Sequence, residues 1–223
     1  MELNYNTPPV LFVGLSGTGK STAIETLPPA RTLIINTENK MMPFRSHKDF
    51  TVMDIRGYTA LMDVLRQLMS PEGSEAFDYV VLDSFTSLTE IIEGWANAAF
   101  SGFSQWKEYN GALQSVIKVM KQLPQQVFVI GIPEREDVEF GSAKMYLRVK
   151  GKELKYQIEK EFSVVMFTNP LYDEESGEMT DVEMMYKPNR LNTSKSPQGM
   201  FSERPKNDML AIANTIKGYY DVT

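Results

Sequence analysis

The amino-acid sequence predicts an α/β fold in which helices flank a mostly parallel central sheet. Short apolar runs alternate with segments of helical periodicity, the pattern that parallel strands and their crossover helices produce. The chain has 223 residues and contains no linker long enough to separate two units. We therefore expect a single domain over residues 1–223.

Five apolar runs supply the predicted strands of the sheet: Val10–Val13, Thr32–Asn36, Thr51–Ile55, Tyr79–Leu82 and Val127–Ile132. Helical spacing of leucine, valine, isoleucine and methionine predicts one helix through residues 61–68 and a longer one through residues 113–120. The stretch Ser70–Gly73 predicts a turn before the fourth strand, because it combines serine, proline and glycine.

The pattern changes after Ile132. Apolar spacing predicts a short helix through residues 154–162 and a last helix over Asp208–Tyr219. Between them, Val164–Thr168 and Val182–Lys187 are predicted strands joined by a polar loop, which gives a C-terminal β-hairpin extension of the sheet.

The composition excludes several classes of protein. There is no cysteine, so disulfide frameworks and thiol chemistry are excluded, and a reducing cytoplasm is the expected location. The first residues lack a signal peptide, no stretch has the length of a membrane span, and no membrane partner is expected. The net charge of −6 argues against a protein that coats nucleic acid over its whole surface, but it allows local basic patches.

Residues 14–21 have the spacing G-x-x-x-x-G-K-[ST] between a predicted strand and a short predicted helix. In such a loop, successive backbone N–H groups face one anion, and the helix N-terminus adds its positive dipole end. Lys20 would reach the β- and γ-phosphates, and Ser21 would bind Mg²⁺. The alternative is a glycine turn that binds nothing. We expect a nucleoside triphosphate to be held by Gly14, Leu15, Ser16, Gly17, Thr18, Gly19, Lys20, Ser21 and Thr22.

A second nucleotide motif lies at residues 77–84, where an apolar strand ends in Asp83. This is the Walker B pattern, which places an aspartate beside the magnesium ion at the carboxyl edge of the sheet. On its own it is weak, because buried strands also end in aspartate for turn or capping reasons. Downstream of a complete phosphate loop, it predicts that Asp83 and Ser21 hold Mg²⁺.

Hydrolysis also requires a group that orients or deprotonates the attacking water. Ser84, and not a glutamate, follows Asp83, so that common arrangement is absent. The strand next to the phosphate-loop strand is expected to be Thr32–Asn36, and Glu38 follows it on the nucleotide side of the sheet. We favour Glu38 as the catalytic carboxylate over a surface or capping role.

These motifs resemble those of RecA-like recombinases, in which the Walker B aspartate is followed by residues such as Ser84 and Phe85–Thr89. Over nearly its full length the chain is similar to the short RecA-like ATPases of bacteriophages, which are grouped with single-strand annealing recombination functions. Further points of likeness are Gln105-Trp106, Leu123-Pro124, residues 196–201 and Asn207-Asp208.

The resemblance implies a RecA-like core, the cofactors ATP and Mg²⁺, and ATP-dependent action on single-stranded DNA in phage recombination. It also implies assembly into a homo-oligomeric filament or ring, a partner single-strand binding or annealing protein, and a location in the host cytoplasm. Relatives usually place a polar γ-phosphate sensor after the next strand, where this chain has Pro133. Glu134 or Arg135 would have to serve instead, or the sensing step differs.

The resemblance also indicates where DNA would bind. RecA-like proteins carry mobile DNA-binding loops at the place of residues 135–155, and residues 141–155 have a net charge of +4. Tyr146 could stack a base among these cations. A solvated basic loop with a buried tyrosine is the alternative. The candidate DNA-binding residues are Arg135, Lys144, Tyr146, Arg148, Lys150 and Lys152.

A second basic stretch, residues 187–206, also has a net charge of +4. In RecA-like assemblies such residues reach the ATP of a neighbouring subunit and stabilise the transferring phosphoryl group. Arg190 and Lys195 are the candidates here, and a role at the surface alone is the alternative.

Two other functions remain open from the sequence. One is a P-loop kinase acting on a nucleotide or another small molecule, although residues 135–155 hold only two arginines where a kinase lid would normally be arginine-rich. The other is a nucleotide-gated assembly switch with little turnover.

Overall fold

The computed structural model describes residues 7–138 and 142–221, except for the side chains at positions 138, 142, 152, 153, 155 and 156. A seven-stranded sheet in the order β3-β2-β4-β5-β1-β8-β9 forms its centre. All pairs are parallel except β8 with β9, which confirms the predicted mostly parallel sheet. The strands are β1 (Val10–Val13), β2 (Thr32–Asn36), β3 (Thr51–Asp54), β4 (Tyr79–Asp83), β5 (Gln126–Gly131), β8 (Val164–Tyr172) and β9 (Met179–Met185).

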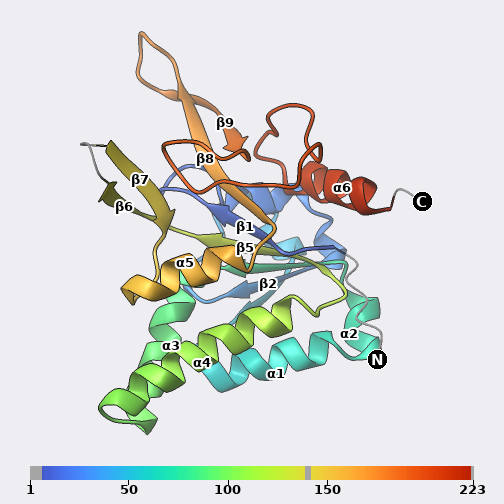
Figure 1. Ribbon diagram of the computed structural model, residues 1–223. Helices are drawn as coiled ribbons and strands as arrows, with labels where there is room; N and C mark the ends of the chain where they lie inside the picture. Colours follow the sequence, from blue (N-terminus) through green and yellow to red (C-terminus); the bar gives the residue numbers. More distant parts are fainter. Residues whose placement is uncertain (1–6, 139–141, 222–223) are drawn as a thin grey trace.

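Helices cover both faces of this sheet (Figure 1). The larger layer packs against one face and includes α1, α3, α4 and α5, whereas α6 packs on the other with the short 3₁₀ helix η1 (Thr22–Thr26). Further 3₁₀ turns are η2 (Pro29–Arg31) and η3 (Arg45–Asp49). The helices are α1 (Tyr58–Leu68), α2 (Pro71–Ala76), α3 (Phe85–Ala99), α4 (Phe103–Met120), α5 (Lys152–Lys160) and α6 (Met209–Tyr220).

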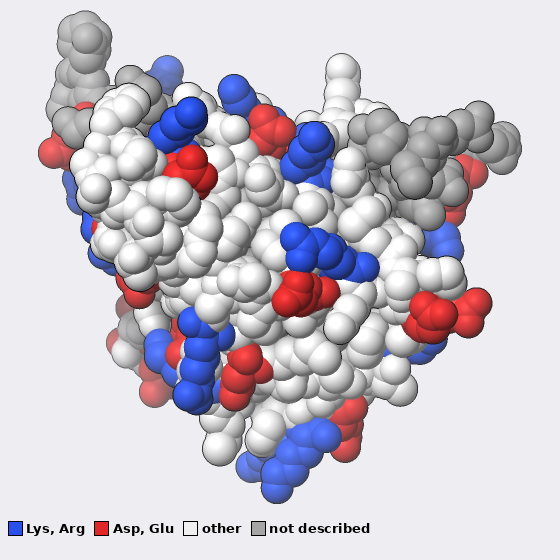
Figure 2. Space-filling view, turned by 90° about the horizontal axis from the view of Figure 1, so that it is seen from below, with Lys and Arg blue, Asp and Glu red and all other residues white. Residues whose placement is uncertain are grey.

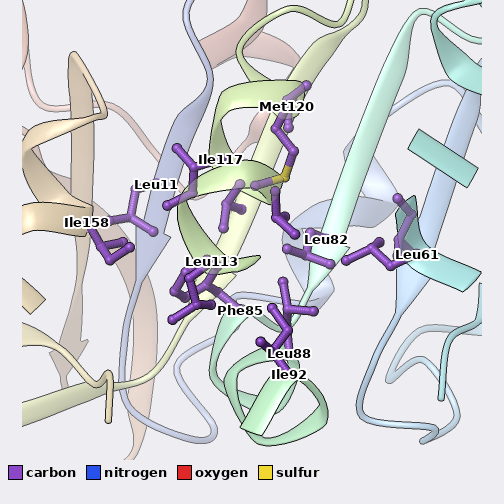
Figure 3. Close-up of a cluster of buried hydrophobic side chains, with 14 of the residues drawn as sticks. Leu11, Leu61, Leu82, Phe85, Leu88, Ile92, Leu113, Ile117, Met120 and Ile158 are labelled. Atoms are coloured by element: carbon purple, nitrogen blue, oxygen red, sulfur yellow. The ribbon is translucent and has the colours of Figure 1, made fainter. Parts of the chain in front are cut away.

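The alternation of side chains along the strands builds two hydrophobic cores. In β1, Leu11 and Val13 belong to the core beneath α3 and α4, whereas Val10 and Phe12 belong to the core beneath α6. Because both faces are covered, the strand is apolar at every position and fully buried. Figure 3 shows the larger core, where Leu113 and Ile117 of α4 meet Leu11 and Phe85.

The predicted strands agree with the structure to within one residue at each end for β1 to β5, but the structure differs from the prediction at α2, at α3 and after the phosphate loop. The α3 helix is not among the predicted elements, although Phe85, Leu88, Ile92 and Ala96 share its buried face. Ser70–Gly73 is not only a turn, because Ser70 caps α2 through its side chain. The helix after the phosphate loop is limited to the 3₁₀ turn η1.

Two hairpins leave the carboxyl edge of the sheet, where the parallel strands end. β6 (Pro133–Val138) follows β5 and pairs with β7 (Ser142–Leu147) in a separate two-stranded sheet. β8 and β9 confirm the predicted C-terminal hairpin, and they extend beyond the sheet as an arm that projects in Figure 1. Residues 173–178 form the polar loop at its tip.

The outermost strand on the side of the sheet away from β9 is β3, which has only four residues, all of them exposed. Asn36 of β2 donates from Nδ2 to Asp54 Oδ1 at 2.7 Å, which ties the carboxyl end of β3 to its neighbour. Over residues 7–138 and 142–221, no helix combines the length and the apolar character needed to cross a bilayer.

Leu113→Ala tests the larger core. Leu113 is fully buried, so its truncation removes apolar contacts and leaves a cavity. We expect the free energy of unfolding in urea to fall by about 2–5 kcal/mol. Leu191→Ala is the control, because Leu191 is 62% exposed and its truncation should cost less than about 0.5 kcal/mol. Equal losses for the two variants would contradict the assigned core.

Candidate nucleotide-binding site

The phosphate-loop residues lie between the end of β1 and the start of η1. Gly17 and Gly19 have φ angles of +81° and +77°, a backbone region that glycine enters without a steric cost. The loop is anchored at both ends: Gly14 N donates to Gly131 O at 3.2 Å, and Ala23 N donates to Gly19 O at 3.0 Å. Because η1 is a single short 3₁₀ turn, the backbone N–H groups and Lys20 carry most of the attraction for an anion, and the helix dipole adds little.

Lys20 is folded back onto its own loop. Its Nζ donates to Leu15 O at 2.7 Å, and the residue is only 9% exposed. Burial lowers the pKa of the Lys20 ammonium, while the carboxylates of Asp83 and Glu38 act in the opposite direction. The structure therefore brings the three residues predicted to act on the phosphates and metal into one electrostatic group.

The predicted metal ligands Ser21 and Asp83 are in contact. The Ser21 side chain is hydrogen-bonded to Asp83, a residue that is 5% exposed. Burial raises the pKa of the Asp83 carboxyl, and the bond from Ser21 opposes this rise. A hydroxyl beside a single carboxylate suits Mg²⁺, which takes few protein ligands and completes its shell with phosphate oxygens and water.

Larger metal clusters are not found nearby or elsewhere in the described chain. Across residues 7–138 and 142–221, no group of three or more His, Cys, Asp or Glu side chains is placed to hold an ion.

The register of β2 against β4 aligns Asp83 with the end of β2. Asn36 pairs with Asp83, and Thr37 N donates to Asp83 O at 2.8 Å. Thr37 Oγ1 donates to Ser84 O at 2.6 Å and accepts from Ser84 N at 2.8 Å. These bonds fasten the carboxyl ends of the two strands together around the Asp83–Ser84 peptide, which is cis.

The prediction that β2 lies next to the phosphate-loop strand is wrong, because β5 and β8 flank β1 and because β4 and β5 separate β2 from it. Glu38 nevertheless follows β2 as expected, and it lies beside the residue after the Walker B aspartate. Ser84 Oγ donates to Glu38 Oε1 at 2.9 Å, and Lys40 Nζ lies 3.1 Å from Glu38 Oε2. The Glu38 side chain is 23% exposed, so water can reach it. The Glu38 carboxylate is close enough to Lys20 and Asp83 to affect the pKa values of both.

Two further residues support the loop from outside, and the sequence analysis gave neither of them a role. Thr168 of β8 lies with its Oγ1 2.8 Å from Thr18 Oγ1. Asn207, just before α6, donates from Nδ2 to Gly19 O at 2.9 Å. They are more than 140 residues away from the loop in sequence, so local spacing contains no signal for them. Asn207 had been noted only as a point of family likeness.

The segment expected to be a mobile DNA-binding loop is instead largely the β6–β7 hairpin and the start of α5. Arg135, Arg148 and Lys150 are exposed, and Lys144 is half-buried with its Nζ 5.9 Å from the centre of the Tyr146 ring. Tyr146 is only 8% exposed, so the prediction that its ring stacks a base is wrong for this conformation. Residues 139–141 and the side chain of Lys152 lie outside the described part.

Acidic side chains accompany these cations. A cleft of about 610 Å³ between α3 and the hairpin is lined by the cations Arg135, Arg148 and Lys150 together with Glu90, Glu93, Glu134 and Glu136. Lys150 forms an ion pair with Glu93. On the lower face of the molecule, Figure 2 likewise shows Lys and Arg interspersed with Asp and Glu among the side chains that it colours. The local field is therefore mixed and not strongly positive.

The two candidates for an arginine-finger role differ in placement. Arg190 is exposed after β9, and its side chain has no hydrogen bond or ion pair within the described ranges. Lys195 is half-buried, its backbone pairs with Val165, and it lies close enough to Glu159 and Glu161 for both to affect its pKa. Burial lowers that pKa, and the two carboxylates oppose the effect. Lys195 is thus less accessible to a neighbouring subunit than Arg190 is, and its role as a finger stays a prediction.

Comparisons with known proteins agree with this geometry. A search of curated proteins finds no match to the chain. A family model described as an AAA domain matches residues 7–198, which include the phosphate loop, Glu38 and Asp83. The match spans most of the 223 residues, and it falls on the sheet that holds the site. The chain therefore belongs to the AAA domain family of P-loop nucleotide-binding ATPases.

Proposed function

We propose that this ATPase binds ATP with Mg²⁺ at residues 14–22 and hydrolyses it in response to single-stranded DNA, in phage recombination or annealing. The observation that carries the nucleotide part is the convergence of Lys20, Asp83 and Glu38 beside the phosphate loop. The DNA part rests on the resemblance to short RecA-like phage ATPases and on the basic side chains of the β6–β7 hairpin. The host cytoplasm is the corresponding location.

The site residues divide the chemistry between them. The backbone N–H groups of the loop and the Lys20 ammonium bind the phosphate oxygens, and Lys20 must leave Leu15 O to do so. Ser21 and Asp83 hold the metal ion, which neutralises charge on the phosphates when it is bound. Glu38, held by Ser84, orients the attacking water and accepts its proton. Lys40 Nζ lies 3.1 Å from the other carboxylate oxygen and helps to hold the Glu38 side chain in place.

The β6–β7 hairpin lies beside the proposed nucleotide site. Arg135 lines a second cleft, of about 550 Å³, together with Gly14, Leu15 and Thr18 of the phosphate loop. A DNA phosphate bound by Arg135 would therefore act beside the loop that holds ATP. Of the two candidate γ-phosphate sensors, Arg135 lines this cleft and Glu134 does not, so we propose Arg135 for that role.

Oligomerisation would complete the site. Arg190 is exposed and is available to a neighbouring subunit, so we propose that it stabilises the transferring phosphoryl group across the interface of a filament or ring. A single-strand binding or annealing protein is the proposed partner on the same DNA.

Lys20→Ala tests the nucleotide site. The change removes the ammonium that contacts the phosphates, so we expect the Kd for a fluorescent ATP analogue with Mg²⁺ to rise at least about tenfold, since hydrogen bonds to charged groups are worth about 1.5–3 kcal/mol. Lys118→Ala, an exposed lysine on α4, is the matched control and should bind as the wild type does. Unchanged binding by Lys20→Ala would remove the basis of the proposal.

Glu38→Gln separates binding from turnover. The amide keeps the size of the side chain but cannot accept a proton, so the variant should bind ATP with the wild-type Kd and lose about 10²-fold or more in kcat. Phosphate release measures turnover, and Glu178→Gln at the tip of the arm is the control. Hydrolysis at the wild-type rate would end the assignment of Glu38.

The role of DNA is tested by measuring ATP hydrolysis with and without single-stranded oligonucleotide. We expect stimulation, and an oligonucleotide affinity that falls as salt rises, because each phosphate contact releases counterions. Arg135→Ala combined with Arg148→Ala should flatten that salt dependence. Phosphate transfer to a small acceptor would identify a kinase instead, and nucleotide binding without turnover would identify a switch.

A further inference from the structure

The side chain of Thr168 makes a hydrogen bond to the phosphate loop whose direction can be assigned. Thr18 Oγ1 donates to Leu15 O at 2.8 Å, which uses its single hydroxyl proton. Thr18 Oγ1 and Thr168 Oγ1 lie 2.8 Å apart, so the proton between them must come from Thr168. Thr168 therefore donates to Thr18, and Thr18 donates to Leu15.

The same carbonyl is the resting partner of Lys20. Leu15 O accepts from Lys20 Nζ at 2.7 Å as well as from Thr18. When Lys20 turns to a phosphate, Thr18 is the remaining side-chain donor to this carbonyl in the described contacts. A fixed Thr18 rotamer thus keeps the Leu15 peptide in place while the ammonium changes partners. Thr18 is 6% exposed, so water replaces this bond poorly.

The register of β8 against β1 brings Thr168 close to the phosphate loop. β8 runs parallel to β1 with Val13 opposite Phe167, so the next residue of each strand, Gly14 and Thr168, also come together. A Cβ atom at Gly14 would lie 2.1 Å from Thr168 Oγ1, which shows that the loop backbone rests directly on this side chain. Thr168 also pairs with Met184 of β9 and stands at the base of the arm.

We propose that Thr168 is a positioning residue for nucleotide binding: its hydroxyl holds Thr18, and through Thr18 it holds the phosphate loop in its anion-binding shape. In this proposal Thr168 acts through Thr18. The inference rests on the proposed binding of a nucleotide at residues 14–22.

Thr168→Val tests the proposal, because valine keeps the branched shape suited to a strand and removes only the hydroxyl. We expect the Kd for a fluorescent ATP analogue and the KM for ATP to rise about fivefold, the typical effect of one lost hydrogen bond, with kcat at saturating ATP within about twofold of wild type. Thr168→Ser restores the donor and should recover wild-type affinity. Thr180→Val removes an exposed hydroxyl from the same arm and should have no effect.

A purely structural role would give a different result. If Thr168→Val binds ATP as the wild type does, or if Thr168→Ser loses as much affinity as the valine variant, the hydroxyl does not position the loop. Thermal unfolding without nucleotide checks that each variant is folded. The double variant Thr18→Val/Thr168→Val should bind no more weakly than Thr18→Val alone, and additive losses would overturn the proposed relay.

The controls also separate this inference from the function on which it rests. If Lys20→Ala abolishes binding and Thr168→Val leaves it unchanged, only the role of Thr168 fails. If Lys20→Ala binds ATP normally, the phosphate loop is not the nucleotide site, and both proposals fail together.

Discussion

The burial of opposite charges at one edge of the sheet is the constraint on which the site depends. Lys20 and Asp83 are each less than one-tenth exposed, and burial disfavours the charged form of both, lowering one pKa and raising the other. Such charges are tolerated where partners compensate for lost water. Here Leu15 O accepts a hydrogen bond from the ammonium, the carboxylates of Asp83 and Glu38 raise its pKa, and Ser21 opposes the rise in the pKa of Asp83. The carboxyl ends of β2 and β4 must therefore be held rigidly. The two hydrogen bonds between Thr37 and Ser84 hold them together.

The topology explains why residues far apart in sequence meet there. The phosphate loop follows β1, Glu38 follows β2, Asp83 ends β4, and the β6–β7 hairpin follows β5, so all emerge at the carboxyl edge of parallel strands. Ligands bind at this edge in open α/β sheets because the loops that can differ without disturbing the core gather there. The β8–β9 arm extends from the same edge, so both hairpins lie on the same side of the sheet as the phosphate loop.

The parts that the sequence predicted well are those with local signals. The phosphate loop has a fixed spacing, and strands such as β1 and β2 are continuous apolar runs because both of their faces are covered. The α3 helix was missed because its start, right after Asp83, was interpreted only as part of a family motif, although Phe85, Leu88 and Ile92 carry helical spacing. The β6–β7 hairpin was taken for a loop because its charged residues hide the strand alternation. Tyr146, Thr168 and Asn207 depend on tertiary contacts, which no local pattern contains.

The outermost strand β3 affects how readily the protein aggregates at high concentration. An unpaired strand offers its free N–H and C=O groups as a template for another chain, and long flat edges promote aggregation. β3 is only four residues long and ends in Asp54, whose charge is engaged by Asn36. The outermost strand on this side of the sheet is thus short and partly acidic, which limits the pairing of strands from other molecules with β3. The carboxyl edge, where the proposed nucleotide site lies, does not depend on this strand and stays open.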